Sequence, residues 1–556
     1  MQINPIRHVA FVVLWFVAGG IADRLAADAP QSPPAPEWPA LESAASGGAT
    51  RHEALLAVAQ DAAAPAHVRA LALLGAAQTA GSAEEAAALW DRLAADATAP
   101  QGYRDEARRR MAGAQRPAQE LPAGDGVEYR TALPVLPDPG AVLHVAPHGD
   151  DAAGGGEAAP LATLAGARNA VRKLRADNGG ALPAGGVRII IHGGTYSSSE
   201  TFTLTAEDSG TAAAPIVYEA APGETPILTG GVRIDSWRPV SDASIKERLA
   251  AAVRDRVREA DLTALGVRDF GDATDLRCVP ELFIDGVPQT LARWPDEGFV
   301  TTGEILGTDT FTVWGSIPGC RDGKFRYVEE RPGTWVDEPD VRLYGYWFWD
   351  WYEEFQQVAG IDADARVFTL AKPYSHYGYR TGQRYRAVNV LRELDCVGEW
   401  YLDRQRGRLY WLPPEGEAWT QATATVSVFA LPFVAWDNAE HVILAGLTIE
   451  DGRGDGIHVR GGAHCVIAGC TLQRLGGDAV VVQGGRQHTV FGCTMHTLGC
   501  GGARVAGGDR ATLSAAGHVI ENCFVADIAR LKRTYAPAVH LDGCGNRIAH
   551  NHFERI

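Results

Sequence analysis

Carboxylate, basic and phenolic side chains gather between residues 504 and 542 of this 556-residue chain. Among them we select Asp509 and Asp542 as a candidate catalytic pair. In such a pair one carboxyl group protonates a glycosidic oxygen, and the other serves as nucleophile or as base for water. The side chains that could bind a substrate beside this pair are Arg504, Arg510, Lys532, Arg533, Tyr535 and His540, together with His458 earlier in the sequence.

The same segment could instead support an elimination reaction on a uronate-containing polysaccharide. Lys532, Tyr535 or His540 could remove a proton, and Arg533 could neutralise the uronate carboxylate. Such a lyase could use Ca²⁺, whereas hydrolysis by two carboxylates needs no cofactor, and the sequence indicates no metal site. A third class, a non-catalytic surface protein that only binds glycans, also fits these residues. Hydrolysis is the leading interpretation because carboxylates are present.

The element that must position these residues is a repeat. From about residue 441 to the end, five segments beginning HVILAG, HCVIAG, HTVFG, HVIEN and NRIAH follow one another at intervals of roughly 23 to 31 residues. Each segment contains two short strand patterns divided by a polar or glycine turn. One such coil cannot bury its own inner face, so the coils must stack. The repeat therefore predicts a right-handed parallel β-helix.

Alternation along the second strand of each coil predicts which side chains face outward. The outward positions form two neighbouring columns, one with His458, Val481, Arg504 and His540, the other with Arg460, Gln483, Ala506 and Asp542. Two longer loops, GGDRATLSAAG and ARLKRTYAPA, border this face, and loops on a rigid scaffold are where function concentrates. Asp455 and Asp478, in GDG and GDA, are interpreted as turn formers.

Three cysteines occupy equivalent positions in successive repeats: Cys470 in GCTL, Cys493 in GCTM and Cys523 in NCFV. A buried free cysteine packs as a small hydrophobic residue. The pattern therefore predicts an inward-facing ladder of thiols and not a set of disulfides.

The rest of the chain divides into blocks of different composition. We expect a signal peptide at 1–29, a linker at 30–50, an α-helical hairpin module at 51–114 and a Pro-rich linker at 115–140. The N-terminal cap and first coils follow at 141–240, then a charged helical insertion at 241–277, an inserted antiparallel β-domain at 278–425 and the remaining coils at 426–556. The fold class is thus mainly β, a parallel β-helix (solenoid) with an inserted β-domain and an N-terminal helical region.

The densest aromatic run, LYGYWFWDWYEEF, lies in the predicted antiparallel domain. Alternation would place Trp347, Trp349 and Trp351 on one face of a strand, where a sugar ring could stack. Alternating aromatic residues also build the cores of β-sandwiches, and we take that as the first interpretation.

Charge and the first residues limit the partners and the location. The formal net charge of −17 argues against nucleic acid or an anionic membrane as partner. It also disfavours a polyanionic substrate, unless a local basic patch or a bound cation offsets the repulsion. The run VAFVVLWFVAGGIA has the length of a signal-peptide core and is short for a membrane span, which needs roughly twenty residues. We expect an exported protein, periplasmic, extracellular or at the cell surface. Its partner should be a polysaccharide or oligosaccharide, with no membrane contact beyond a possible N-terminal anchor.

Several segments resemble a group of bacterial right-handed β-helix proteins that is similar to glycoside hydrolase family 141. They are residues 141–237, ELFIDGVPQTLARWP, GEWYLDRQRGRLYWLPP, GGDRATLSAAG and KRTYAPAVHLDG. That family contains α-fucosidase and xylanase activities, so the resemblance implies a β-helix that acts on carbohydrate. It spans most of residues 141–556 and leaves out the helical region. The pair Asp509 and Asp542 comes from the residues themselves and not from the family. Similar proteins continue through further coils, so we expect coils beyond NHFERI.

Overall fold

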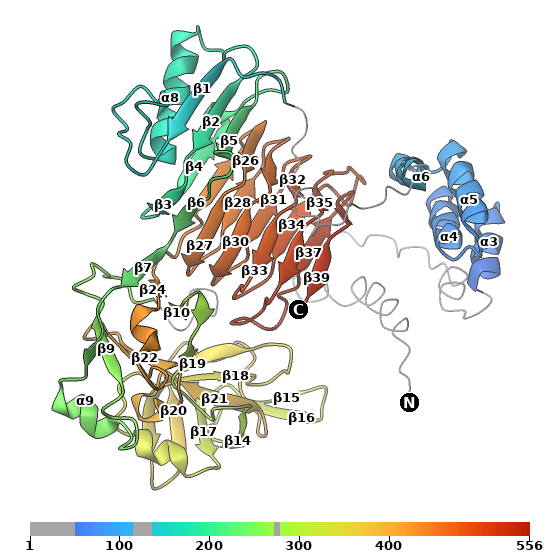
Figure 1. The fold of residues 1–556 in the computed structure, drawn as a ribbon. Coiled ribbons are helices and arrows are strands. Elements are labelled where there is room, and N and C mark those ends of the chain that lie inside the picture. The colour runs from blue at the N-terminus through green and yellow to red at the C-terminus, as the bar shows by residue number, and fades with distance from the viewer. Residues whose placement is uncertain (1–50, 115–135, 272–278) are drawn as a thin grey trace. The chain divides into compact units, whose positions relative to one another are not determined.

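The computed structural model describes residues 51–114, 136–271 and 279–556. The predicted signal peptide at 1–29, the linker at 30–50 and most of the linker at 115–140 lie outside the described residues. The chain divides into two compact units, residues 1–120 and 121–556, and each is described by itself. Figure 1 shows the helical unit in blue and the β-rich unit in cyan to red.

The N-terminal unit contains four described helices, α3 (Arg51–Gln60), α4 (Ala66–Gln78), α5 (Ala83–Ala95) and α6 (Gln101–Ala114). The Ser82 side chain caps α5 by accepting a hydrogen bond from the backbone N–H of Glu85 at 3.1 Å. Apolar side chains from all four helices form one buried cluster. The predicted N-terminal helical region is therefore confirmed. Within the described ranges, no helix is both long enough and apolar enough to cross a bilayer.

Three parallel sheets build the β-helix. The first sheet has the strand order β1 (Ala141–Val145), β2 (Val187–Ile191), β5 (Ile216–Ala220), β26 (Val442–Ala445), β29 (Val466–Ala468), β32 (Thr489–Phe491), β35 (Val519–Glu521) and β38 (Arg547–Ala549). The second has β3 (Gly194–Ser197), β6 (Pro226–Thr229), β27 (Thr448–Gly452), β30 (Thr471–Leu475), β33 (Thr494–His496), β36 (Phe524–Ala526) and β39 (His552–Glu554). The third has β4 (Phe202–Thr205), β25 (Val434–Asp437), β28 (Ile457–Arg460), β31 (Val480–Gln483), β34 (Ala503–Gly507) and β37 (Val539–Gly543). The predicted parallel β-helix is confirmed.

Each coil has three strands, so the prediction of two is wrong. The first pattern of a repeat, such as HVILAGLTIEDG, contributes one strand to the first sheet and one to the second. The chain bends between them at Gly446, whose φ of 75° lies in the left-handed region that glycine adopts at little cost. Because the bend takes only two residues, the two strands look like one continuous pattern in the sequence.

The interior of the coils holds the predicted cysteine ladder. Cys470, Cys493 and Cys523 are at most 1% exposed, and all belong to the same core cluster. The eight cysteines that the structure describes are free thiols. Hydrogen bonds with the thiols of Cys470 and Cys523 raise the pKa of the Cys493 thiol, and burial adds to the rise. The ladder is therefore a packing element of the β-helix core.

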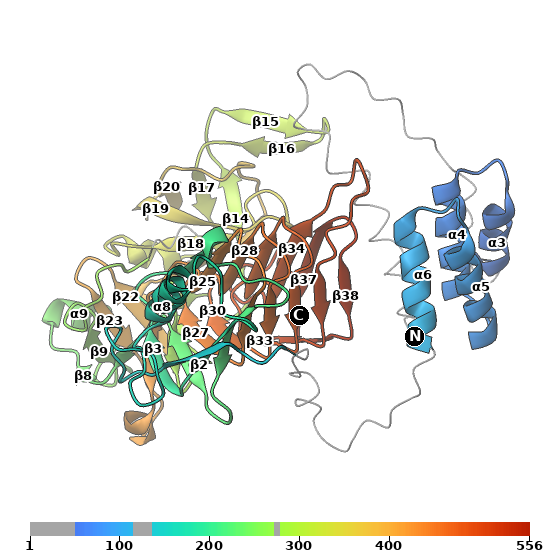
Figure 2. The same cartoon turned by 90° about the horizontal axis from the view of Figure 1, so that it is seen from above.

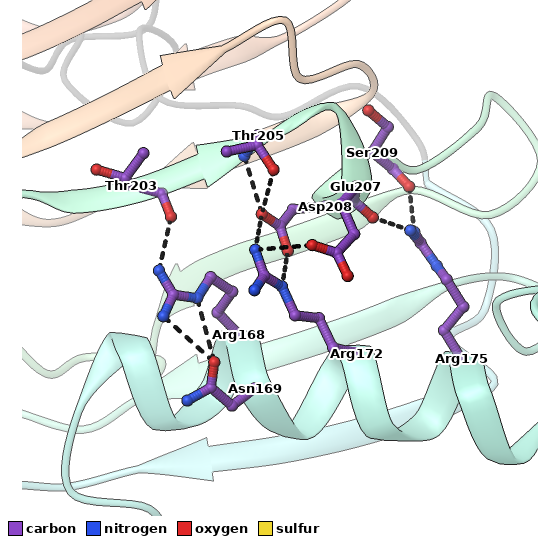
Figure 3. Close-up of polar contacts among 9 residues, drawn as sticks. All are labelled: Arg168, Asn169, Arg172, Arg175, Thr203, Thr205, Glu207, Asp208 and Ser209. Carbon is purple, nitrogen blue, oxygen red and sulfur yellow. Dashed lines mark hydrogen bonds and ion pairs between the residues drawn. The ribbon is translucent and has the colours of Figure 1, made fainter.

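Helix α8 (Leu164–Asp177) covers the end of the first coil, next to β1 and β4 (Figure 1). Figure 3 shows how its arginines hold it there. Arg172 forms two hydrogen bonds with the buried carboxylate of Asp208, at 2.6 and 2.8 Å, and Arg168 donates to the Thr203 carbonyl at 2.9 Å. Although burial alone would raise the pKa of Asp208, the Arg172 guanidinium holds it below its usual value. The helix thus shields edge strands that could otherwise pair with another chain.

An antiparallel domain is inserted between β6 and β25, as predicted, but it begins earlier than residue 278. Its strands are β7 (Gly231–Ile234), β8 (Arg238–Pro239), β9 (Arg258–Asp261), β10 (Leu282–Ile284), β11 (Val287–Pro288), β12 (Thr290–Leu291), β13 (Arg293–Trp294), β14 (Val300–Ile305), β15 (Thr310–Val313), β16 (Ile317–Cys320), β17 (Lys324–Tyr327), β18 (Arg342–Gly345), β19 (Glu354–Asp362), β20 (Val367–Leu370), β21 (Arg384–Val388), β22 (Glu399–Asp403), β23 (Arg408–Trp411) and β24 (Ala424–Ser427). Strand β7 pairs with β24, and β8 and β9 extend the sheet of β22 and β23.

The charged helical insertion predicted at 241–277 is not found in the described part of that segment, residues 241–271. Its described part holds one short helix, α9 (Ala243–Arg248), and strand β9. Its charged residues suggested helices, but β9 pairs antiparallel with β23 and buries Glu259 and Ala260. This segment is therefore a structural part of the inserted domain.

Candidate functional site

The outward face of the third sheet carries the two columns that the sequence predicts. The register pairs Arg504 with His540 and Ala506 with Asp542, and His458 lies two strands further back in the same column as Arg504. His458 Nε2 lies 2.7 Å from Asp455, and its Nδ1 lies 3.1 Å from Arg460. A carboxylate on one ring nitrogen and a guanidinium donor on the other orient this imidazole within the outer face.

Asp455 and Asp478 connect the turns of successive coils, as their interpretation as turn formers implies. The Asp455 carboxylate accepts a hydrogen bond from the backbone N–H of Asp478 at 2.7 Å, and Asp478 accepts one from Gly501 at 2.8 Å. Asp478 also forms an ion pair with Arg504 at 3.2 Å. Arg504 is therefore anchored to the corner of the coil, and its guanidinium has a fixed position on the outer face.

Asp509 and Asp542 lie at the other edge of this face, where the third sheet leads back to the first. The Asp542 carboxylate is half-exposed and forms an ion pair with Arg510. Asp509 accepts the backbone N–H groups of Ala511, at 2.8 Å, and Thr512, and these bonds lower the pKa of its carboxyl group. Asp509 thus folds its own loop and is ionised at neutral pH, which suits a nucleophile or base.

A loop at the opposite edge, residues 527–538, connects β36 to β37 and contacts the inserted domain. Glu353, which is 1% exposed, accepts the backbone N–H groups of Arg533 and Thr534 at 2.6 and 2.9 Å. Arg530 forms two hydrogen bonds with Glu281 at 2.7 and 2.9 Å. Both contacts join parts of the chain far apart in sequence, so they fix the inserted domain along the corner between the second and third sheets. Three of the predicted residues, Lys532, Arg533 and Tyr535, lie on this loop, which leads directly into β37 with His540.

Beyond this loop an aromatic surface continues onto the inserted domain. It consists of Trp314, Trp349, Trp351, Tyr377 and Tyr535, and is named here the aromatic surface. Successive ring centroids lie 5.4 Å apart for Trp314 and Trp349, 6.0 Å for Trp349 and Trp351, and 6.4 Å for Trp351 and Tyr535. Trp314 lies at the tip of the hairpin β15–β16, which projects from the inserted domain in Figure 2, and it is 82% exposed.

Two members of the aromatic surface adopt backbone conformations that aromatic residues rarely take. Trp314 has a φ of 49° and Tyr535 a φ of 55°. For a bulky residue this left-handed region is costly, and such outliers concentrate at functional sites. Large exposed aromatic rings of this kind mark interaction surfaces.

The predicted row of three indoles on one strand is wrong. Trp347 is 1% exposed and belongs to the core of the inserted domain. Residues 346–353 are not a strand, so alternation does not apply, and only Trp349 and Trp351 turn toward the surface. The position of Trp314 beside Trp349 could not be predicted from the sequence, because the two residues lie on different loops.

One group of side chains among the described residues could hold a cation. Ligand atoms of Asp296, Asp395 and Cys396 all lie within 4.8 Å of one another. Burial and the neighbouring Asp296 charge raise the pKa of Asp395, which disfavours two ionised carboxylates there. We assign no role to this acidic group, which belongs to the inserted domain and not to the outer face.

Glu399 gives a pH dependence that can be measured. It is 3% exposed, and burial raises its pKa to about 8, although three backbone N–H groups point at its carboxyl group. Because the folded state then holds a proton that the unfolded state has lost, stability falls as pH rises from 5 to 8, by at most about 1.4 kcal/mol per pH unit. Urea unfolding across this range should show that decline, and Glu399→Gln should flatten it. An unchanged slope in the variant would contradict this assignment.

Comparison with known proteins agrees with this architecture. Residues 433–556 match the family model described as "Right handed beta helix region". The chain therefore contains a right-handed β-helix. Its fold resembles a solved structure titled "Glycoside hydrolase", with 18% identity, 70% of this chain and 74% of that chain covered, and a TM-score of 0.55. A second structure, titled "The complex structure of XylC with xylose", has 12% identity and a TM-score of 0.37. The match covers 74% of this chain and 62% of that chain. No curated protein matches the sequence. At 18% identity the likeness to the first structure extends to the fold, and the activity of this protein has to be argued from its own residues.

Proposed function

We propose that this β-helix protein is an exported carbohydrate-active enzyme that hydrolyses a polysaccharide on the outer face of its third sheet. The aromatic surface is the observation that carries the proposal. A sugar ring offers an apolar C–H face that packs on an indole, whose own face is electron-rich. Four connected rings leading from a projecting hairpin to the loop beside His540 fit an extended chain of sugars better than a compact ligand.

The chemistry falls to the two carboxylates at the far edge of the same face. Asp509 is held ionised by backbone N–H groups and serves as nucleophile or as base for water. Asp542 serves as proton donor to the leaving oxygen. A bound sugar that displaces Arg510 would cover this carboxyl group, and burial favours the neutral, proton-donating form. His540 and Arg504 border the path and can bind hydroxyl groups.

Glycan binding tests the proposal. Trp351→Ala should weaken the affinity for a glycan that the enzyme hydrolyses about 10- to 100-fold, which is the effect of removing a central aromatic contact. Phe553→Ala is the matched control, because Phe553 is also 41% exposed but lies on β39 in the second sheet. Affinity electrophoresis in plant and algal polysaccharides gives the comparison. Equal affinities for the wild type and Trp351→Ala would contradict the role of the aromatic surface.

A lyase reaction is the second candidate. Lys532, Arg533 and Tyr535 belong to the loop 527–538, which leads into the strand of His540, and these residue types could remove a proton from a uronate and bind its carboxylate. One assay separates the classes when reducing ends and the absorbance of unsaturated uronates are measured together. Reducing ends alone indicate hydrolysis, and absorbance indicates elimination. Binding without either product indicates a protein that only holds the glycan.

A further inference from the structure

A cavity of about 290 Å³ lies where the loop 527–538 meets the inserted domain. This junction cavity is close to the lower limit of ligand sites, roughly 300 Å³, and so has room for one sugar unit. Its walls come from β12, β13, β18, β21 and β22 on one side and from Arg530 and Leu531 on the other. The loop therefore supplies one of its walls.

The charge in this cavity is positive. Arg293, Arg386 and Arg530 all line it, and only Arg530 is neutralised, by Glu281. Among the residues that the structure describes, no carboxylate lies within ion-pair distance of Arg293 or Arg386, and the Nε atom of each is buried without a hydrogen-bond partner. The indole N–H of Trp400, which also lines the cavity, is 1% exposed and has no partner either.

Two guanidinium groups without a counter-charge destabilise the folded state unless a negatively charged ligand occupies the cavity. Burial and the nearby charge of Arg293 lower the pKa of Arg386 to about 10, and its guanidinium lies 4.9 Å above the Tyr344 ring. A buried cation without a counter-charge destabilises a folded protein, and an unsatisfied buried donor adds to the cost. Glu399 does not supply the missing charge, since its pKa of about 8 keeps it mostly neutral at pH 7. Three arginines therefore line one space that holds a single paired carboxylate, and a planar oxyanion there would supply the missing counter-charge.

We propose that the junction cavity binds an oxyanion carried by the glycan, either the carboxylate of a uronosyl unit or a sulfate ester. Arginine offers a rigid fork of N–H donors that matches these groups with two parallel hydrogen bonds. The inference rests on the proposed function for its substrate and adds the class of that substrate. It also gives a reason for a local cationic site in a protein whose net charge is −17.

Calorimetric titration of the full chain with sodium D-galacturonate, its neutral methyl ester and sodium sulfate tests the site. Galacturonate should bind, and Arg386→Met should weaken its binding at least about 10-fold, as expected for a lost charge-assisted pair. The matched control is Arg384→Met, two residues earlier on β21, where the guanidinium stacks on Tyr346 outside the cavity. Arg293→Met should repeat the loss and serves if Arg386→Met does not fold. Without ligand, Arg386→Met should unfold at the wild-type temperature or above it, which a purely structural arginine would not do.

The outcomes separate the two proposals. Galacturonate binding that depends on Arg386 supports a carboxylate site, and sulfate binding with the same dependence supports a sulfate-ester site. Binding of the methyl ester as tight as that of galacturonate, or equal affinities in Arg386→Met and wild type, would overturn the oxyanion site. If the anion site is absent but glycan binding still depends on Trp351, the proposed function stands. An Arg386-dependent anion site without any glycan binding would instead remove the proposed function alone.

Discussion

Asp542→Asn is expected to lower the turnover of a susceptible glycan by about 10²- to 10⁴-fold, which is the contribution of a positioned general acid or base. Asparagine keeps the shape and a hydrogen-bond acceptor for Arg510 but cannot give up a proton. The carboxylate is half-exposed, so the folded state should lose little stability. Steady-state hydrolysis measured by released reducing ends, together with thermal unfolding, checks both statements. Asp509→Asn should lower turnover similarly, because an amide is neither a nucleophile nor a base. The loop should stay folded, since asparagine can still accept the N–H of Ala511.

The matched control for Asp542 is Asp437→Asn. Asp437 lies in the same outward column of the third sheet, four strands away, and it also pairs with an arginine, Arg460, at 3.3 Å. Asp437 lies on β25, away from the two long loops that leave β34 and enter β37. Equal turnover in Asp437→Asn and the wild type is expected. If Asp542→Asn retains full activity, the carboxylate pair is not the catalytic centre, and the lyase residues Lys532 and Tyr535 become the next candidates.

Glu281→Ala is expected to reduce the free energy of unfolding by about 3–5 kcal/mol. The Glu281 side chain is 7% exposed, and its removal leaves the Arg530 guanidinium half-buried in a cavity that already holds two unpaired arginines. The loss is large because an isolated buried charge is penalised, and not because the ion pair itself is strong. Urea unfolding followed by far-ultraviolet circular dichroism gives the value.

A double-variant cycle separates these causes. Glu281→Ala combined with Arg530→Ala should recover much of the stability, since the uncompensated charge is then gone. Asp177→Ala is the surface control: its pair with Lys173 on α8 is well exposed, and the expected change is below about 1 kcal/mol. If the double variant is no more stable than Glu281→Ala alone, the junction is held by packing and not by this charge pair.

The coils were predictable because their signal is local and repeated. Inward and outward positions alternate within each strand, and the same alternation recurs one coil later, so Arg504, His540 and Asp542 could be placed on one face from the sequence. The bend at Gly446 was missed because a two-residue corner does not interrupt the apolar pattern. Trp347 was misplaced for the converse reason, since alternation was applied to a segment that is not a strand.

The junction could not be predicted, because its parts come together only in the folded inserted domain. Glu281 and Arg530 are 249 residues apart, and Glu353 and Thr534 are 181 apart. Nothing in the spacing of Arg293 and Arg386 indicates a common cavity, since their strands β13 and β21 become neighbours through antiparallel pairing. Contacts of this kind depend on how the inserted domain docks on the loop 527–538, and the pattern of a single repeat does not indicate that docking.

The number of coils sets where the inserted domain can hold the loop. The domain leaves the β-helix between β6 and β25, and the loop 527–538 lies at the same corner four coil steps later, between β36 and β37. At about 4.8 Å per step, the domain must reach about 19 Å along the helix axis to place Glu281 and Glu353 against that loop. The number of stacked coils therefore sets the axial distance between the point where the inserted domain leaves the β-helix and the loop 527–538. A variant lacking one whole coil would keep its core and its outer face, yet bring the loop about 4.8 Å short of its partners and leave the junction open.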